Sequence, residues 1–241
     1  EIEAARLAFQ ERNRYVADPA MAEVPVAALL SREHTRGLCA LVDREKTMPS
    51  LPRIDLPNHG DTVYLSVVDR DTNAVSMINS VYTAFGSGLT GPGSGVLLQN
   101  RGVSFSLDSA HVNCIAPQKR PLHTIIPGML KKDQKAVMPF GVMGGQYQPI
   151  GHAHLLSNLL DYGLDIQEAV DLARVYPSPE GEVEAEDGVP DPVRQELSNR
   201  GHYVIRPEAP IGGGQAIWID WGKGVLIGGS DPRKDGCALG F

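Results

Sequence analysis

The stretch Thr62-Val63-Tyr64-Leu65-Ser66-Val67-Val68-Asp69 decides the fold class, because it combines β-branched and aromatic residues without proline or glycine. Such a composition is typical of a β-strand. Residues 70–72 are polar and residues 73–82 (NAVSMINSVY) return to a strand composition, so the sequence predicts a hairpin. Further extended segments are expected at 96–107, 123–130, 136–142, 202–206, 215–221 and 224–227.

Five helices are predicted from periodic apolar residues and from capping residues. The first is expected over residues 1–16, where Ile2, Ala5 and Phe9 share one face, and the second begins near Ser31, a favourable N-cap. The third has a leucine stripe at 155–160 and ends at Gly163, and the fourth begins with the capping-box pair Asp165 and Glu168. The fifth begins at Asp191-Pro192, an N-cap followed by proline at the first helical position. From residue 62 onward the order is strands, helices, strands. This order indicates an α+β fold with antiparallel sheets.

Residues 47–61 have the composition of turns and linkers, with several prolines, one glycine and no regular spacing of apolar residues. A boundary is therefore expected here, which divides the chain into residues 1–61 and 62–241.

Composition excludes several classes of protein. A chain of 241 residues with 42% hydrophobic and 21% charged residues can bury a sizeable core and is neither disordered nor fibrous. The net charge of −7 argues against a nucleic-acid partner, and no apolar run reaches about 18 residues, so no membrane span is expected. Three cysteines without metal-ligand spacing, and no visible secretory leader, slightly favour the cytoplasm, although the compartment stays unknown.

Single motifs decide little by themselves. The glycine-rich residues 86–95 match neither phosphate-binding motif, so an ordinary loop is expected. His152 and His154 would point to different faces of a helix, which disfavours a metal pair. Gly144-Gly145 could aim two backbone N–H groups at one point, as in an oxyanion hole, but a plain turn is the commoner use of such a pair.

Several of these stretches, taken together and in order, resemble a known family. Residues 61–69, 73–75, 85–88 and 95–100 resemble the γ-glutamyltranspeptidase family around its catalytic threonine. The resemblance continues through residues 119–122, 144–145, 161–164 and 229–233. Residues 1–61 resemble the end of that family's large subunit, including residues 12–15 and Asp18-Pro19.

The resemblance implies an N-terminal-nucleophile hydrolase with a four-layer αββα sandwich, made as a precursor that cuts itself between Asp61 and Thr62. Thr62 would be the nucleophile. Its freed α-amine, with a reference pKa of about 8, would be the general base for its own hydroxyl. Gly144 and Gly145 would hold the oxyanion, and Ser80 stands where the family has a hydroxyl that binds the amine of the nucleophile.

The resemblance also shows where substrate binding departs from the family. Tyr82 stands in place of the usual Asn, Ser104 in place of the acidic residue for the glutamyl α-amino group, and His123-Thr124 in place of a serine pair for the α-carboxylate. With Arg101, these make up the candidate substrate-binding residues. The pattern is similar to a divergent branch that includes proteins resembling cephalosporin acylases, so catalysis is expected to be kept and γ-glutamyl recognition to be altered.

The favoured function is a self-processing N-terminal-threonine amide hydrolase or acyltransferase acting on γ-glutamyl or related acyl amides, such as glutathione-like or glutaryl compounds. The alternative is an unprocessed, non-catalytic relative with a binding or structural role. Neither needs a metal or an organic cofactor. The expected partners are a small amide, water or an amine acceptor, and the remainder of the large subunit, because the sandwich is expected to be incomplete at the N-terminus; a homo-oligomer is left open.

Overall fold

The computed structural model describes residues 1–48, 61–178 and 181–241, so most of the expected linker lies outside the described residues. The described chain forms two compact units. Unit 1 contains residues 1–48, Arg101–His123 and Arg174–Pro207, and unit 2 contains residues 61–100, Thr124–Ala173 and Glu208–Phe241. This division follows contacts, whereas the division at the Asp61–Thr62 bond concerns cleavage and stays a prediction.

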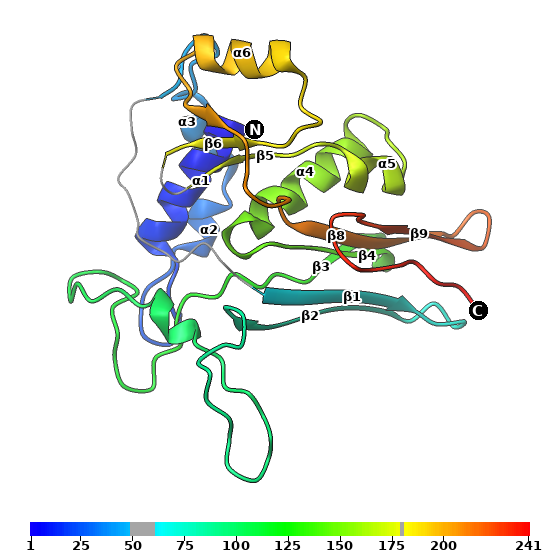
Figure 1. Ribbon diagram of the computed structural model, residues 1–241, viewed down its shortest axis with the longest axis horizontal. Helices are drawn as coiled ribbons and strands as arrows, with labels where there is room; N and C mark the ends of the chain where they lie inside the picture. The colour runs from blue at the N-terminus through cyan, green and yellow to red at the C-terminus, as the bar shows by residue number, and fades with distance from the viewer. Residues whose placement is uncertain (49–60, 179–180) are drawn as a thin grey trace. The chain divides into compact units, whose positions relative to one another are not determined.

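Unit 2 is built from an antiparallel sheet, a separate hairpin and two helices. The sheet has the order β3 (Gly128–Lys132), β4 (Lys135–Met143), β8 (Gly213–Asp220), β9 (Val225–Ser230); the hairpin is β1 (Asp61–Val68) with β2 (Ala74–Tyr82); the helices are α4 (Gln148–Leu160) and α5 (Ile166–Asp171). Figure 1 shows α4 and α5 on one side of the sheet and the hairpin on the other. Helices, sheet and hairpin are therefore three successive layers of this unit.

Tyr64 fastens the hairpin to the sheet. Its ring lies on Gly141 of β4, where an added Cβ would come within 2.4 Å of the ring. The Tyr64 hydroxyl lies 2.8 Å from the Ser76 Oγ, which donates to the carbonyl of Phe140 at 3.2 Å. Burial raises the pKa of Tyr64 to about 12. A glycine in β4 thus lets an aromatic ring pack directly on backbone and fixes β1 over β4.

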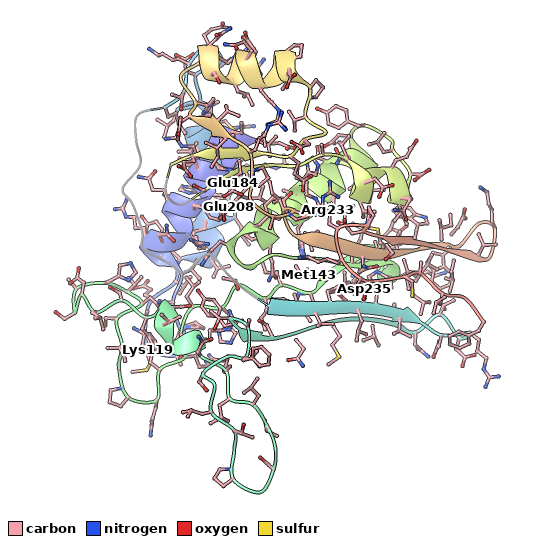
Figure 2. All side chains as sticks on the ribbon, in the orientation of Figure 1. Lys119, Met143, Glu184, Glu208, Arg233 and Asp235 are labelled. Carbon is pink, nitrogen blue, oxygen red and sulfur yellow. The ribbon has the colours of Figure 1, made fainter. Side chains whose placement is uncertain are left out.

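Polar side chains attach α5 to the edge of the sheet. Asp165 and Glu168 form the predicted capping box. Gln167 bonds both backbone groups of Ser230, at 2.9 and 3.1 Å. Arg233, labelled in Figure 2, donates to the carbonyls of the last turn of α5 and to the buried Asp231. A cation at a helix C-terminus is favourable because the helix dipole is negative there.

Unit 1 combines helices with a small sheet. Its elements are α1 (Ile2–Tyr15), α2 (Val26–Leu29), α3 (Arg32–Cys39), η1 (Arg101–Ser104), β5 (Val175–Pro177), β6 (Val183–Ala185), α6 (Asp191–Asn199) and β7 (Val204–Ile205). The Ser31 Oγ accepts from the N–H of His34, as expected of an N-cap. Phe9 and Tyr176 meet edge to face with ring centroids 6.4 Å apart, and Arg120 donates to the buried Asp18 at 2.8 Å.

The α+β class and the hairpin are confirmed, and three local expectations are wrong. Residues 96–107 were expected to be extended, but they contain η1 and no strand, because the Asn100 side chain bonds the N–H of Thr83 and turns the chain there. Helix α6 begins at Asp191 itself, with Pro190 at the cap. Strands β6 and β7 are parallel, since α6 connects them as a crossover. Within the described residues, no helix is both long and apolar enough to cross a bilayer.

Candidate functional site

Thr62 lies at the start of β1, directly opposite Ser80 of β2. The two side-chain oxygens are 3.2 Å apart, with the Thr62 hydroxyl donating to Ser80. The Ser80 Oγ also accepts from the N–H of Tyr82 at 3.0 Å. The structure therefore brings three of the predicted site residues together, with the Ser80 hydroxyl at their centre.

A β-bulge stands opposite the bond that the sequence marks for cleavage. Asp61 pairs with Tyr82 and Thr62 pairs with Ser80, so Val81 is the extra residue. Tyr82 is 2% exposed and has a φ of 82°, a left-handed conformation that costs a non-glycine residue about 1–3 kcal/mol. Bulges re-aim neighbouring side chains and often adjoin active sites. No sequence signal marks a tyrosine for this conformation, so the sequence could not show the bulge.

The glycine pair follows the end of β4. Gly144 has a φ of 133°, and Gly145, which opens the short helix η2 (Gly145–Tyr147), has a φ of 56°. A Cβ added to Gly144 would lie 2.8 Å from the Cα of Gly212. Both the backbone conformation and the close approach therefore require glycine at 144.

Within the described part of the chain, the N–H groups of Gly144 and Gly145 donate to no other group. The carbonyl of Gly144 is used, because it accepts from the N–H of Tyr147 at 3.0 Å. Two adjacent N–H groups left available at a strand end can stabilise a developing oxyanion.

The two halves of the candidate site lie at the same end of unit 2. Strands β1 and β4 run in opposite directions and pack on one another through Tyr64 and Gly141. Two residues before Tyr64 is Thr62, and two residues after Gly141 is Met143, which Figure 2 labels beside the start of β1. The start of β1 and the glycine pair at the end of β4 therefore share one end of the layered unit.

The substrate-binding candidates divide between the units. Thr124 lies in unit 2 and is 5% exposed. Arg101 and Ser104 are buried in η1 of unit 1, and Asn113 donates to the carbonyl of Ser104 at 2.7 Å. His123, also in unit 1, is exposed, and its Nδ1 lies 2.9 Å from the Pro121 carbonyl. Arg101, Ser104 and His123 thus belong to the other unit than Thr62, and their roles stay predictions.

Three residues near the glycine pair were not assigned a role by sequence reasoning. Gly212, at a φ of 66°, lies against Gly144 and starts a run of three glycines that could have signalled a close approach. His152 on α4 accepts the N–H of Val142 at its Nε2, at 3.0 Å. Gln148, one turn earlier, is fully buried and accepts the N–H of Ile126 at 3.1 Å.

His152 is held neutral by its surroundings. Burial lowers the pKa of His152 to about 4, and its ring lies 5.0 Å from that of Phe140. A backbone N–H can only donate, so the Nε2 must be unprotonated. Among the described residues no cluster of three or more His, Cys, Asp or Glu side chains could hold a metal ion.

Comparison with known proteins gives a family. The family model described as gamma-glutamyltranspeptidase matches residues 1–241. The chain is 38% identical to the "Glutathione hydrolase-like YwrD proenzyme" of Bacillus subtilis, over 100% of this chain and 46% of that protein. It is 32% identical to the "Oxamate amidohydrolase proenzyme" of Klebsiella pneumoniae, over 100% of this chain and 46% of that protein.

Among solved structures, the chain is similar to a cephalosporin acylase from Bacillus halodurans, with a TM-score of 0.88 and 42% identity, over 97% of this chain and 43% of that one. The chain thus spans less than half the length of these relatives.

Proposed function

Because the chain belongs to the γ-glutamyltranspeptidase family, we propose that it carries the nucleophile of a self-processing amide hydrolase or acyltransferase. The observation that carries the proposal is the Thr62–Ser80 hydroxyl pair, 3.2 Å apart, at the same end of unit 2 as the Gly144-Gly145 pair. This arrangement combines a nucleophile, a hydroxyl to orient it and two N–H groups for an oxyanion.

Maturation begins with attack of the Thr62 Oγ on the carbonyl carbon of Asp61. The peptide C–N bond breaks as the C–O bond forms, and the threonine nitrogen takes up the proton that the hydroxyl loses. Water then hydrolyses the ester, which leaves a carboxylate on Asp61 and a free amine on Thr62. The bulge opposite this bond supports the proposal, because Val81 and Tyr82 interrupt regular pairing where the chain must be attacked.

Turnover repeats the same chemistry on a substrate amide. The free amine of Thr62 takes the proton of its own hydroxyl, whose oxygen attacks the substrate carbonyl. The N–H groups of Gly144 and Gly145 bind the oxyanion, and loss of one such donor costs about 3–4 kcal/mol of transition-state stabilisation. The amine leaves with a proton, and water or an amine acceptor then receives the acyl group from the ester. Ser80 orients the amine of the nucleophile throughout.

The substrate class we propose is acyl amides. The relatives include a glutathione hydrolase-like protein, an oxamate amidohydrolase and a cephalosporin acylase, and these names all point to attack on an amide-type carbonyl. Ser104 offers a neutral hydroxyl where the family has an acid for the α-ammonium group, and an ammonium without a partner is costly in a desolvated site. We therefore propose acyl groups without an α-amine, of which glutaryl is one.

The main test is replacement of Thr62 in the complete precursor. Thr62→Ala is expected to remain one uncut chain without amidase activity, whereas Thr62→Ser is expected to cut more slowly and keep activity, because its hydroxyl and future amine both survive. Mass spectrometry would locate the cut, and anilide hydrolysis would measure turnover. Cleavage of the Thr62→Ala chain at Asp61–Thr62 would show that the site is misplaced, and an active wild-type protein that is never cut would overturn self-processing.

The acyl preference needs a separate comparison, of kcat/KM for γ-glutamyl and glutaryl anilides, which differ only in the α-amino group. We expect the glutaryl anilide to be preferred, because loss of the hydrogen bond to the α-ammonium group, worth about 1.5–3 kcal/mol, lowers the preference for the α-amino form by roughly tenfold to a hundredfold. Ser104→Asp is expected to invert it. A γ-glutamyl preference of about a hundredfold or more that persists in Asp108→Asn, which removes the nearest acid in sequence, would contradict the proposal.

A further inference from the structure

The pairing of β3 with β4 ends at Gly128 and Phe140, although the flanking residues could extend it. The same register continued by two residues would pair Ile126 with Val142. Instead, the N–H of Ile126 goes to the Oε1 of Gln148 at 3.1 Å, and the N–H of Val142 goes to the Nε2 of His152 at 3.0 Å. Two side chains thus take the N–H groups that the strands would otherwise direct toward one another.

Both side chains come from one face of α4, because residues four apart on a helix lie one above the other. Gln148 is fully buried, and His152 is held between the backbone of Val142 and the ring of Phe140. Since each N–H has an acceptor, the strands separate without leaving either donor unpaired. Val142 keeps its place opposite Gly214 of β8, so the separation moves residues 124–126 and not β4.

The segments that separate here are the two that matter for the proposed reaction. Two residues beyond Val142 the chain reaches the Gly144-Gly145 pair, and two residues before Ile126 it reaches Thr124. The geometry points to Gln148 and His152 as a pair of positioning residues that hold residues 124–126 away from the end of β4. In this way they set the spacing between the oxyanion donors and the substrate-binding segment, and hence the acyl length accepted; this inference rests on the proposed function.

The test measures a ratio that loss of folded protein does not change. The complete, self-processed protein is compared with Gln148→Met and His152→Leu, each of which removes one acceptor with little change in size. The readout is kcat/KM for glutaryl anilide divided by that for adipoyl anilide, which is one methylene longer. We expect this ratio to change by about fivefold or more in both variants, because a methylene in a fitted pocket is worth about tenfold or more.

Gln167→Met is the matched control. Gln167 also bonds strand backbone from a helix, but it does so from α5 at Ser230 of β9. Its ratio is expected to stay within about twofold of that of the wild-type protein. His152→Gln places an amide oxygen near the position of the Nε2 and is expected to restore the ratio lost in His152→Leu. The double variant, Gln148→Met with His152→Leu, is expected to change the ratio no more than the single variant with the larger effect. The reason is that both residues hold the same segment, residues 124–126, away from β4.

The inference is overturned if Gln148→Met and His152→Leu keep the wild-type ratio while only their melting temperatures fall, or if Gln167→Met changes it equally. Should one of Gln148→Met and His152→Leu fail to mature, the other still decides, because loss of either acceptor is expected to change the ratio. Failure of the proposed function gives a different result, since the wild-type protein would then hydrolyse neither anilide.

Discussion

At the scale of single residues, Gly144 is the position where substitution tests the oxyanion role most directly. Gly144→Ala would force a Cβ to 2.8 Å from the Cα of Gly212 and leave a non-glycine residue at a φ of 133°. We expect kcat to fall by about a hundredfold or more, because the N–H groups would be displaced from the oxyanion position. Anilide hydrolysis by the processed protein measures this.

Gly163→Ala controls for the effect of backbone conformation alone. Gly163 also has a positive φ, 71°, but a Cβ there would meet nothing within 4 Å. A loss of about 1 kcal/mol of stability is expected, with kcat unchanged. Equal losses of kcat in the two variants would show that the Gly144 effect is general destabilisation.

The lowered pKa of His152 makes the stability of the protein depend on pH. Its pKa is about 4 in the folded protein, against an ordinary value of 6.5, because burial disfavours the charged form. Between pH 6.5 and 4 the unfolded chain binds a proton that the folded chain does not. The free energy of unfolding is therefore highest, as far as His152 is concerned, above pH 6.5. It decreases as the pH falls from 6.5 to 4, by at most about 3 kcal/mol. Urea unfolding at several pH values should show this slope, and it should be shallower in His152→Gln.

The residue scale also shows what the sequence alone could not supply. By composition Thr62 is an ordinary strand residue, and only the resemblance to a family singles it out. The pairing of Thr62 with Ser80 follows the register that the hairpin keeps from Val63 to Val68, and the bulge at Val81 shifts only the next pair, Asp61 with Tyr82. Tyr82 in this bulge has a left-handed conformation that non-glycine residues adopt rarely, and nothing in its local sequence indicates it.

At the scale of elements, the hairpin has one face without a covering layer among the described residues. Tyr64 faces the sheet, while the alternate side chains of β1 and β2 are exposed and apolar. They are Val63, Leu65, Val67, Val75 and Met77. Monomeric proteins rarely leave such a contiguous apolar face in water, so we expect the remainder of the precursor to cover it.

Leu65→Lys tests this expectation in the complete precursor. A lysine there would be buried without a partner, so we expect less soluble and less processed protein. Leu160→Lys is the control, because Leu160 is also exposed but lies at the end of α4. Normal processing of Leu65→Lys, measured by gel densitometry, would show that the face stays in water.

Local signals predicted most elements, and the failures occurred where tertiary contacts decide. Capping residues placed α5 and the start of α3 correctly, since these bonds form within one turn. Residues 96–107 have an apolar composition that resembles a strand, yet the Asn100 side chain and the buried Arg101 hold them in a turn and η1. The short strands β5 and β6 were not predicted, because three residues carry too little periodicity.

At the scale of the whole molecule, the predicted cut would not separate its products. Cleavage at Asp61–Thr62 would leave residues 1–61 on one fragment, but unit 1 also uses Arg101–His123 and Arg174–Pro207 from the other. The contacts that join them include Asp18 with Arg120, the N–H of Thr47 with the carbonyl of Arg200, and Phe9 with Tyr176. The fragments should therefore form one folded body.

Size-exclusion chromatography of the cut protein checks this prediction. One native peak is expected, which a denaturing gel resolves into separate fragments. Addition of about 6 M urea should divide the peak, because the fragments are joined only through folded structure. Two native peaks would contradict the prediction and would mean that unit 1 does not survive cleavage.

The close contact between Gly144 and Gly212 has a consequence for anyone who wishes to change the acyl selectivity by directed evolution. The two backbones touch without intervening side chains, so any side chain at Gly144 or Gly212 would clash. Nearly every library member that changes either glycine is therefore expected to be inactive. Useful diversity has to be sought at residues 124–126 and at Gln148 and His152, the two α4 side chains proposed to position them. Libraries concentrated there would sample new selectivities without changing the contact between Gly144 and Gly212.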